Sequence, residues 1–353
     1  MSRIASTLLA LALAVPFGLA LQQTKTDQAA SQSAPPLRDL ILTGNVDESV
    51  RVARQNPGEV AAVLNRILEE VDAQITDRKI SEARSSLAAV DKFTDAYASP
   101  SDSGNRALRD AIKGRILRVD GIQLSDDAHF DKAEPKLWEA LELSTKAGDK
   151  RLEGGIHNNL GYALMGLERL DDAAREFDSA RTIAEEQKDP LRAGSYNFNF
   201  GLALFRLGSN EEALRAFSRS EEQNKSVSKT SMEARAVLYQ GIVTSKMHPT
   251  GKEPMSYLTR AEKMFEQLGD SRNTGLSLWL MAQQTAFGGD LTEAGHVAEK
   301  AVPFLVKAND KDTLALCYGF IAMAYDQSKS EEDRAKAEKY KKLAEEIKKE
   351  NPG

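Results

Sequence analysis

The chain has 353 residues, of which 41% are apolar, 28% charged and 6% aromatic, and its formal net charge is −6. This balance excludes an intrinsically disordered chain, and the scarcity of aromatic residues favours helices over sheets. The mild negative charge, without a clustered basic face, argues against nucleic acid as the main partner. The single cysteine, Cys317, excludes a disulfide within the chain, and its apolar neighbours predict a buried small side chain.

The first two predicted segments are an export signal and a tether. Residues 1–20 combine a basic start at Arg3 with a long uncharged apolar run that ends in small residues suited to a cleavage site. This layout predicts a signal peptide and therefore an extracytoplasmic protein, periplasmic or secreted. An uncleaved N-terminal membrane anchor is the alternative, although Pro16 interrupts the apolar run. Residues 21–36 are polar and lack an apolar period, which predicts a flexible linker.

Residues 37–99 come next and carry an irregular helical pattern. Ile80, Ala83, Leu87 and Val90 recur at the spacing of one helix face. The segment therefore predicts one or two degenerate helical hairpins. A stretch rich in Ser, Pro and Gly, residues 98–105, marks a break before a more regular region.

The regular region, residues 107–350, repeats every 40 residues. Gly121, Gly161, Gly201 and Gly241 follow this period, and an alanine comes twelve positions after each of the first three. Small side chains let two antiparallel helices pack closely, so each repeat glycine is expected against the alanine that follows it by twelve. Phe217, four residues beyond such an alanine, is expected to fill the gap towards the next repeat. The pattern predicts an all-α fold, a right-handed α-solenoid of about six hairpins whose last helix is a cap.

Two stretches, residues 159–180 and 200–217, carry a motif of this kind in full. The order Asn-Leu-Gly-Tyr-Ala, a turn, and then Ala and Phe resembles the tetratricopeptide repeat (TPR). The usual TPR period is about 34 residues, so the longer period here is similar to the long-helix arrays of the kinesin-light-chain type. The resemblance implies tight turns between the helices of a hairpin, at Gly208 and at Glu168-Arg169.

The resemblance also implies a binding site, because in TPR proteins the first helix of each hairpin lines a concave groove. Positions around each repeat glycine are then expected to be exposed to a ligand. Asn159 and Asn199 stand two residues before a glycine, where peptide-binding members use an asparagine amide to hold a ligand backbone. Arg118 and Arg235 stand where a cation would meet a carboxylate, although Tyr162 replaces a second expected asparagine. The predicted groove residues are Arg118, Asn158, Asn159, Tyr162, Phe198, Asn199, Phe205, Arg235, Tyr239 and Trp279. In the alternative interpretation these asparagines are merely solvated and the aromatic residues pack between repeats.

No motif for catalysis stands out in the sequence. The four histidines lack metal-ligand spacing, and neither a GxSxG motif nor a Gly-rich phosphate loop is present. We therefore expect no enzyme, no metal and no cofactor. The sequence predicts an exported TPR scaffold or adaptor that binds a protein or peptide. The alternative is a structural subunit of an envelope complex, tethered by its N-terminus.

Overall fold

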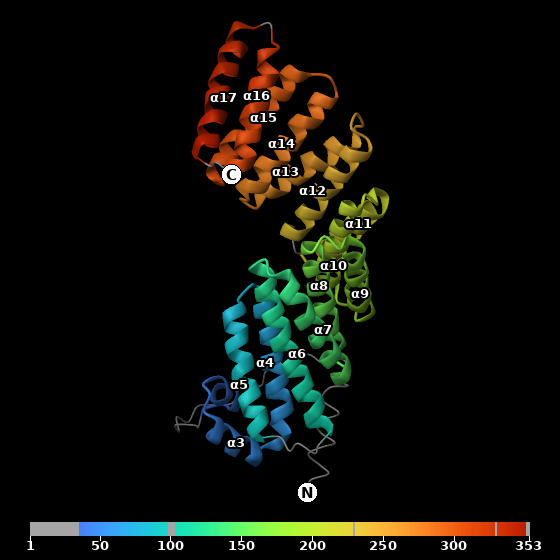
Figure 1. The fold of residues 1–353 in the computed structure, drawn as a ribbon, viewed down its shortest axis with the longest axis vertical. Helices are drawn as coiled ribbons and strands as arrows, with labels where there is room; N and C mark the ends of the chain where they lie inside the picture. Colours follow the sequence, from blue (N-terminus) through green and yellow to red (C-terminus); the bar gives the residue numbers. More distant parts are fainter. Residues whose placement is uncertain (1–34, 98–102, 229, 329, 351–353) are drawn as a thin grey trace, which may run out of the picture. The chain divides into compact units, whose positions relative to one another are not determined.

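The computed structural model describes residues 35–97, 103–228, 230–328 and 330–350 (Figure 1). Throughout these ranges every regular element is an α-helix, α2 to α17. The predicted all-α fold of successive helical hairpins is confirmed. The predicted signal peptide lies outside the described residues, as do nearly all of the predicted linker and residues 98–102 of the predicted break. Among the described helices, none combines the length and the apolar character needed to cross a membrane.

Contacts divide the chain into two compact units, Met1–Arg169 and Leu170–Gly353, each described here by itself. This division falls inside the region that the sequence predicts as one array. The helices of the first unit are α2 (Leu37–Leu42), α3 (Val46–Gln55), α4 (Pro57–Thr76), α5 (Ile80–Tyr97), α6 (Ser103–Asp126), α7 (Phe130–Ala147) and α8 (Lys150–Gly166).

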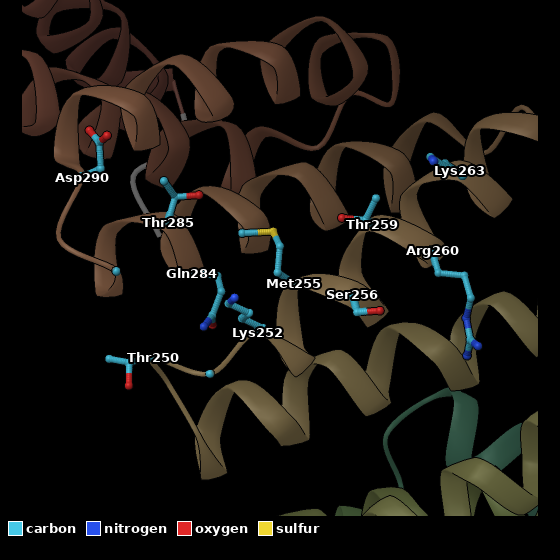
Figure 2. Close-up of a pocket in the computed structure, with 12 residues that line it drawn as sticks. Thr250, Lys252, Met255, Ser256, Thr259, Arg260, Lys263, Gln284, Thr285 and Asp290 are labelled. Carbon is cyan, nitrogen blue, oxygen red and sulfur yellow. The ribbon is translucent and has the colours of Figure 1, made fainter.

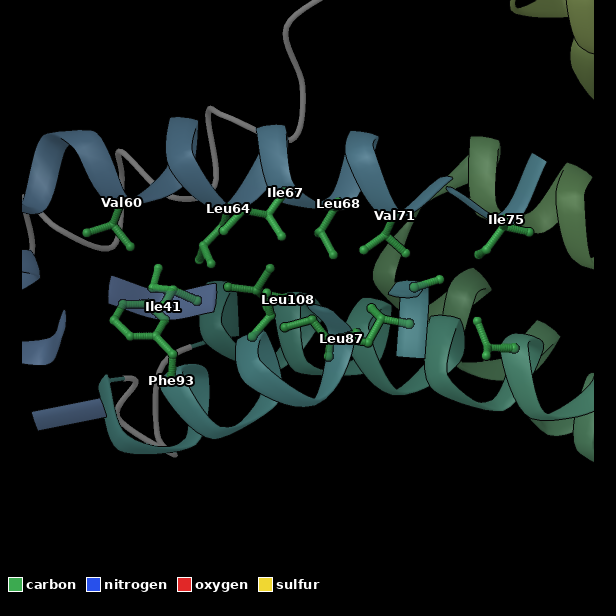
Figure 3. Packing of buried hydrophobic residues seen from close by; sticks show 14 of the residues in the cluster. Ile41, Val60, Leu64, Ile67, Leu68, Val71, Ile75, Leu87, Phe93 and Leu108 are labelled. Atoms are coloured by element: carbon green, nitrogen blue, oxygen red, sulfur yellow. The ribbon is translucent and has the colours of Figure 1, made fainter. Parts of the chain in front are cut away.

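The core of the first unit joins the irregular helices to the first regular one. Apolar residues of α4 recur every three or four positions and face α5 and α6 (Figure 3). Leu87 and Phe93 of α5 and Leu108 of α6 meet this face, and all three are buried. Because α6 shares this core, residues 37–97 do not form a body separate from the helix that opens the predicted array.

The second unit contains nine helices among its described residues. They are α9 (Leu170–Glu186), α10 (Pro190–Leu207), α11 (Asn210–Ser226), α12 (Thr230–Met247), α13 (Glu253–Gln267), α14 (Ser271–Phe287), α15 (Leu291–Lys307), α16 (Lys311–Asp326) and α17 (Glu331–Glu350). Each helix packs against the next one along the chain, from α9 to α17.

Aspartates begin many of these helices. The carboxylates of Asp189, Asp270 and Asp310 each accept a hydrogen bond from the backbone N–H three residues later, at 3.1 Å in every case. An N-cap of this kind satisfies a backbone donor that the helix leaves unpaired. Two helices also end in a left-handed turn residue. Gly208, after α10, has φ +83°, and Glu168, after α8, has φ +59°. Both predicted tight turns therefore contain a residue in the left-handed conformation.

The repeat glycines make room for a large side chain of their own hairpin. A Cβ atom built on Gly201 would lie 2.8 Å from the ring of Phe217, and one built on Gly121 would lie 2.6 Å from Leu137. In both hairpins the closest neighbour of the glycine comes sixteen residues later, whereas the expected contact with the alanine twelve residues later stays a prediction. Phe217 also reaches the next repeat as expected, since its ring centroid lies 5.3 Å from that of Tyr239.

Candidate binding surface

Arg118 of α6 lies inside the first unit instead of on an open groove. Only 7% of the residue is exposed. Its Nη1 atom lies 3.6 Å from Oδ1 of Asp72 on α4, and its Nε donates a 2.9 Å hydrogen bond to Oδ1 of Asn159 on α8. Gly155 leaves space for the guanidinium, because a Cβ there would approach it to 2.7 Å. The expectation that Arg118 is exposed to a ligand is therefore wrong, and Asn159 is engaged by the arginine.

A second buried arginine completes this cluster. The Nη1 atom of Arg115 lies 2.9 Å from Oδ2 of Asp149, and its Nη2 atom lies 3.6 Å from Oδ2 of Asp72. Burial acts to lower the pKa of Arg115, but the two carboxylates outweigh it and raise the pKa above its ordinary value. Two arginines and two aspartates thus balance within the cluster, as buried charges require. Asp72 was detectable in the sequence, since it interrupts the apolar face formed by Leu68 and Ile75.

The other predicted groove residues of the first unit lie nearer its surface. Tyr162 on α8 is 43% exposed, and its ring meets Phe130 edge-on with 6.2 Å between the centroids. Asn158 is half-buried. Of the predicted residues in this unit, Tyr162 is the one that a partner reaches most directly.

In the second unit, three predicted groove residues form one stack between neighbouring hairpins. Phe198 of α10 is 1% exposed, and the Tyr239 ring of α12 packs on it edge-on at 5.2 Å. The Arg235 guanidinium carbon lies 4.7 Å from the centroid of the Phe198 ring. Phe198 therefore packs between repeats and is wrong as an exposed groove residue. Arg235 is exposed and Tyr239 half-buried at the edge of the stack.

The remaining three predicted residues differ in accessibility. Asn199 and Phe205 on α10 are half-buried, and the Lys246 ammonium lies 4.9 Å from the centre of the Phe205 ring. Trp279 on α14 is only 8% exposed, and its ring meets Phe320 of α16 edge-on at 5.1 Å. Trp279, like Phe198, serves mainly as packing between hairpins.

An apolar strip on α16 extends the predicted surface into the last hairpin. Leu316 is 65% exposed and Met323 47% exposed, and half-buried Phe320 lies between them along the helix. The three residues, here named the α16 strip, follow the i, i+4, i+7 spacing of one helix face. Phe320 and Met323 occupy the same positions around Ala322 as the predicted groove residues occupy around the repeat glycines. The strip was not among the predicted groove residues, although its spacing is visible in the sequence.

A separate open groove of about 780 Å³ lies along α13 and the end of α14 (Figure 2). Lys252, Arg260 and Lys263 line it with one carboxylate, Asp290. The loop before α13 forms one wall, and the Gln284 amide holds this loop by donating a hydrogen bond to the carbonyl of Pro249. Arg260 also forms an ion pair with Glu221 at 2.9 Å, so part of the positive charge is already balanced.

Within the described part of the chain, no three His, Cys, Asp or Glu side chains are grouped so that they could hold a metal ion. Cys317 is fully buried, and its Sγ lies 3.4 Å from the carbonyl oxygen of Ala298. The predicted packing role of Cys317 agrees with this position.

Comparisons with protein-family models and with curated proteins give no match. Solved structures do match. One is a signal-transduction ATPase with numerous domains that carries a tetratricopeptide repeat sensor, from Pyrococcus horikoshii, with TM-score 0.65 and 19% identity. The match covers 91% of this chain and 48% of that protein, so this chain spans about half its length.

Two Rap proteins are also similar. The apo form of RapI has TM-score 0.54 and 10% identity, with 81% of this chain and 97% of RapI covered. A Rap protein complexed with competence and sporulation factor has TM-score 0.52 and 13% identity, with 89% and 93% covered. At these identities the likeness concerns the fold. The predicted resemblance is confirmed at that level: the chain has the fold of a tetratricopeptide-type helical repeat protein.

Proposed function

We propose that this protein is an exported scaffold whose first helices hold an apolar segment of a protein or peptide partner. The observation that carries the proposal is the α16 strip. Leu316 and Met323 lie on the first helix of the last hairpin, and about half or more of each residue is exposed. Phe320, between them, contacts Trp279 of the neighbouring hairpin. A strip with this spacing matches the way an apolar helix or extended segment docks on a repeat surface.

The energetics favour a partner with bulky apolar side chains. Burying a leucine or methionine side chain fully contributes about 1.5–3 kcal/mol, so the strip supplies enough free energy to select among segments. On other first helices of the same unit, Asn199 and Tyr239 are half-buried and carry polar groups.

The structural neighbours agree with a binding role. One is a repeat sensor, and another was solved in complex with competence and sporulation factor. Both are similar to this chain in fold, and neither identifies the partner. The proposal for this chain therefore depends on the α16 strip.

The export part of the proposal rests on residues 1–20 alone. Fractionation of cells that express the full chain should place it outside the cytoplasm, and deletion of residues 2–20 should retain it in the cytoplasm. An unchanged distribution after the deletion would dismiss the signal.

The binding part is tested by photo-crosslinking in the native cell. A benzophenone amino acid at position 316 should give a discrete crosslinked partner. The same group at position 306 is the matched control, because Val306 is 55% exposed on α15 of the same unit. Crosslinks of equal yield from both positions, or none from position 316, would refute the proposed surface. A large complex captured from both positions would instead favour a structural subunit of an envelope assembly.

A further inference from the structure

A second, smaller pocket of about 270 Å³ lies among α9, α10 and α11, away from the α16 strip. Arg181 of α9 and Arg215 and Arg219 of α11 line it, with Phe200 and Asn197 of α10. Glu212 is the one carboxylate among the lining residues. Arg181 is already paired with Asp178 and Glu185, so any excess positive charge of the lining comes from Arg215 and Arg219, which face only Glu212 among the lining residues.

The amide of Asn197 is fixed in one orientation. Its Nδ2 lies within hydrogen-bond distance of Oε1 of Glu185 at 3.0 Å, Oε1 of Gln223 at 3.0 Å and the carbonyl of Ala193 at 3.1 Å. These three acceptors require the nitrogen on that side, so the oxygen must face the other way. The residue is 1% exposed, and its Oδ1 has no hydrogen-bond partner among the described residues.

A complementary orphan donor belongs to the same lining. The Nε of Arg181 is also buried without a hydrogen-bond partner in the described structure. Its guanidinium carbon lies 5.0 Å from the centre of the Phe200 ring, and its terminal nitrogens form ion pairs with Asp178 and Glu185. Stacking and ion pairs thus hold the side chain while Nε stays unused. A buried donor and a buried acceptor without partners are each unfavourable until a ligand or water binds them.

Two further arginines stand at the mouth of this pocket. Arg215 is 66% exposed, and the nearest nitrogen–oxygen distance to Glu212 is 4.0 Å, the outer limit of an ion pair. Arg219 is exposed and forms no ion pair within the described ranges. Guanidinium groups with little competition from carboxylates suit an incoming carboxylate.

We propose that this pocket binds an acidic peptide segment. A backbone N–H of the segment donates to Asn197 Oδ1, a backbone carbonyl accepts from Arg181 Nε, and a neighbouring carboxylate side chain binds Arg215 and Arg219. A peptide group offers one donor and one acceptor, which is what the two orphan atoms require. This site is independent of the apolar strip and assigns the protein a second partner chemistry.

The test is calorimetric titration of the full chain with the peptide acetyl-Glu-Glu-Glu-amide. Binding should weaken at least tenfold in the double variant Arg215→Gln/Arg219→Gln. The matched control Arg334→Gln/Lys342→Gln removes the same charge from exposed positions on α17 of the same unit and should stay within twofold of the wild type. If both double variants bound the peptide equally weakly, the loss would reflect the net charge of the protein alone, and the proposed site would be wrong.

Two further ligands separate a peptide from other carboxylates. Acetyl-Gln-Gln-Gln-amide should bind at least tenfold more weakly than the glutamate peptide, because it lacks the carboxylates. Succinate should also bind more weakly, because it lacks the peptide group; equal binding would make this a small-molecule carboxylate site. A crystal structure of the glutamate complex should show a peptide group on Asn197 Oδ1, and an ordered water alone at that atom would refute the proposal.

Discussion

The Nε atom of Arg118 donates a 2.9 Å hydrogen bond to the Oδ1 atom of Asn159. This bond links α6 to α8, and the ion pair of Arg118 with Asp72 extends the link to α4. With Arg115 and Asp149, the cluster connects three helices through charges that have little contact with water. A cluster of this kind is sensitive to the removal of one member, because the opposite charge then stays buried and unbalanced.

We therefore expect Arg118→Met to lower the free energy of unfolding by about 3–5 kcal/mol. Urea denaturation followed by circular dichroism measures the loss. Arg84→Met is the matched control, because Arg84 pairs with Asp120 at 2.9 Å while its side chain is 52% exposed. The control should lose under about 1 kcal/mol. Equal losses of unfolding free energy in the two variants would show that the buried cluster stabilises the protein no more than an exposed ion pair does.

The repeat glycine Gly201 and the last-hairpin glycine Gly319 should respond oppositely to the same substitution. Gly201→Ala pushes a methyl group against the Phe217 ring and should destabilise the protein by about 1–3 kcal/mol. Gly319→Ala meets nothing within 4 Å and should stabilise α16 by about 0.5–1 kcal/mol. Thermal or urea unfolding of the two variants distinguishes them. A shift of the same sign in both would contradict the packing described for Gly201.

Asp310 should contribute a pH-dependent part of the stability. Burial acts to raise the pKa of its carboxyl, but hydrogen bonds from Arg272 and from Thr313 outweigh burial and lower the pKa below its ordinary value of 3.8. A carboxyl with a lowered folded-state pKa stabilises the protein above the unfolded-state pKa, and this contribution is lost as the pH falls through the folded-state value.

Asp310→Asn should accordingly be less stable than the wild type at pH 7, by under about 1 kcal/mol because Arg272 is largely exposed. The difference should shrink as the pH falls from about 4 to about 2. Urea midpoints of both proteins across this range provide the measurement. A difference that grows on acidification would contradict the role assigned to Asp310.

The thiol of Cys317 should be unreactive towards alkylating reagents in the folded protein. Burial raises the pKa of its thiol to about 12, so the thiolate is almost absent at pH 8. Alkylation by iodoacetamide should be at least about 10³-fold slower than for an unfolded cysteine. In urea, where the chain is unfolded, one equivalent of iodoacetamide should react at the rate of an ordinary exposed cysteine. Rapid labelling of the native protein would show that the thiol is accessible.

The fold was predictable because its determinants lie within one period. The glycines, the large residues that pack on them and the capping aspartates act inside a single hairpin or at its immediate turn. Gly201 needs only Phe217 of its own hairpin, and Asp189 needs only the backbone of the helix that it begins.

The binding surface was less predictable because its residues depend on neighbours outside the period. Arg118 is buried by Asp72, which belongs to an irregular helix that no repeat register describes. Phe198 is covered by Tyr239 and Arg235 of the next hairpin, so the same register position is open in one repeat and closed in another. The α16 strip escaped notice for the opposite reason: the last hairpin has only the cap beyond it, and its Leu316 therefore stays exposed.

The most direct test of the central claim is the affinity of a peptide selected from a random library against the full chain. Leu316→Glu places a charge in the α16 strip and should weaken binding at least tenfold. Val306→Glu places the same charge at a similarly exposed position on α15 and should leave the affinity within twofold of the wild type. Equal affinities of the two variants for the selected peptide would contradict a partner site on the first helices.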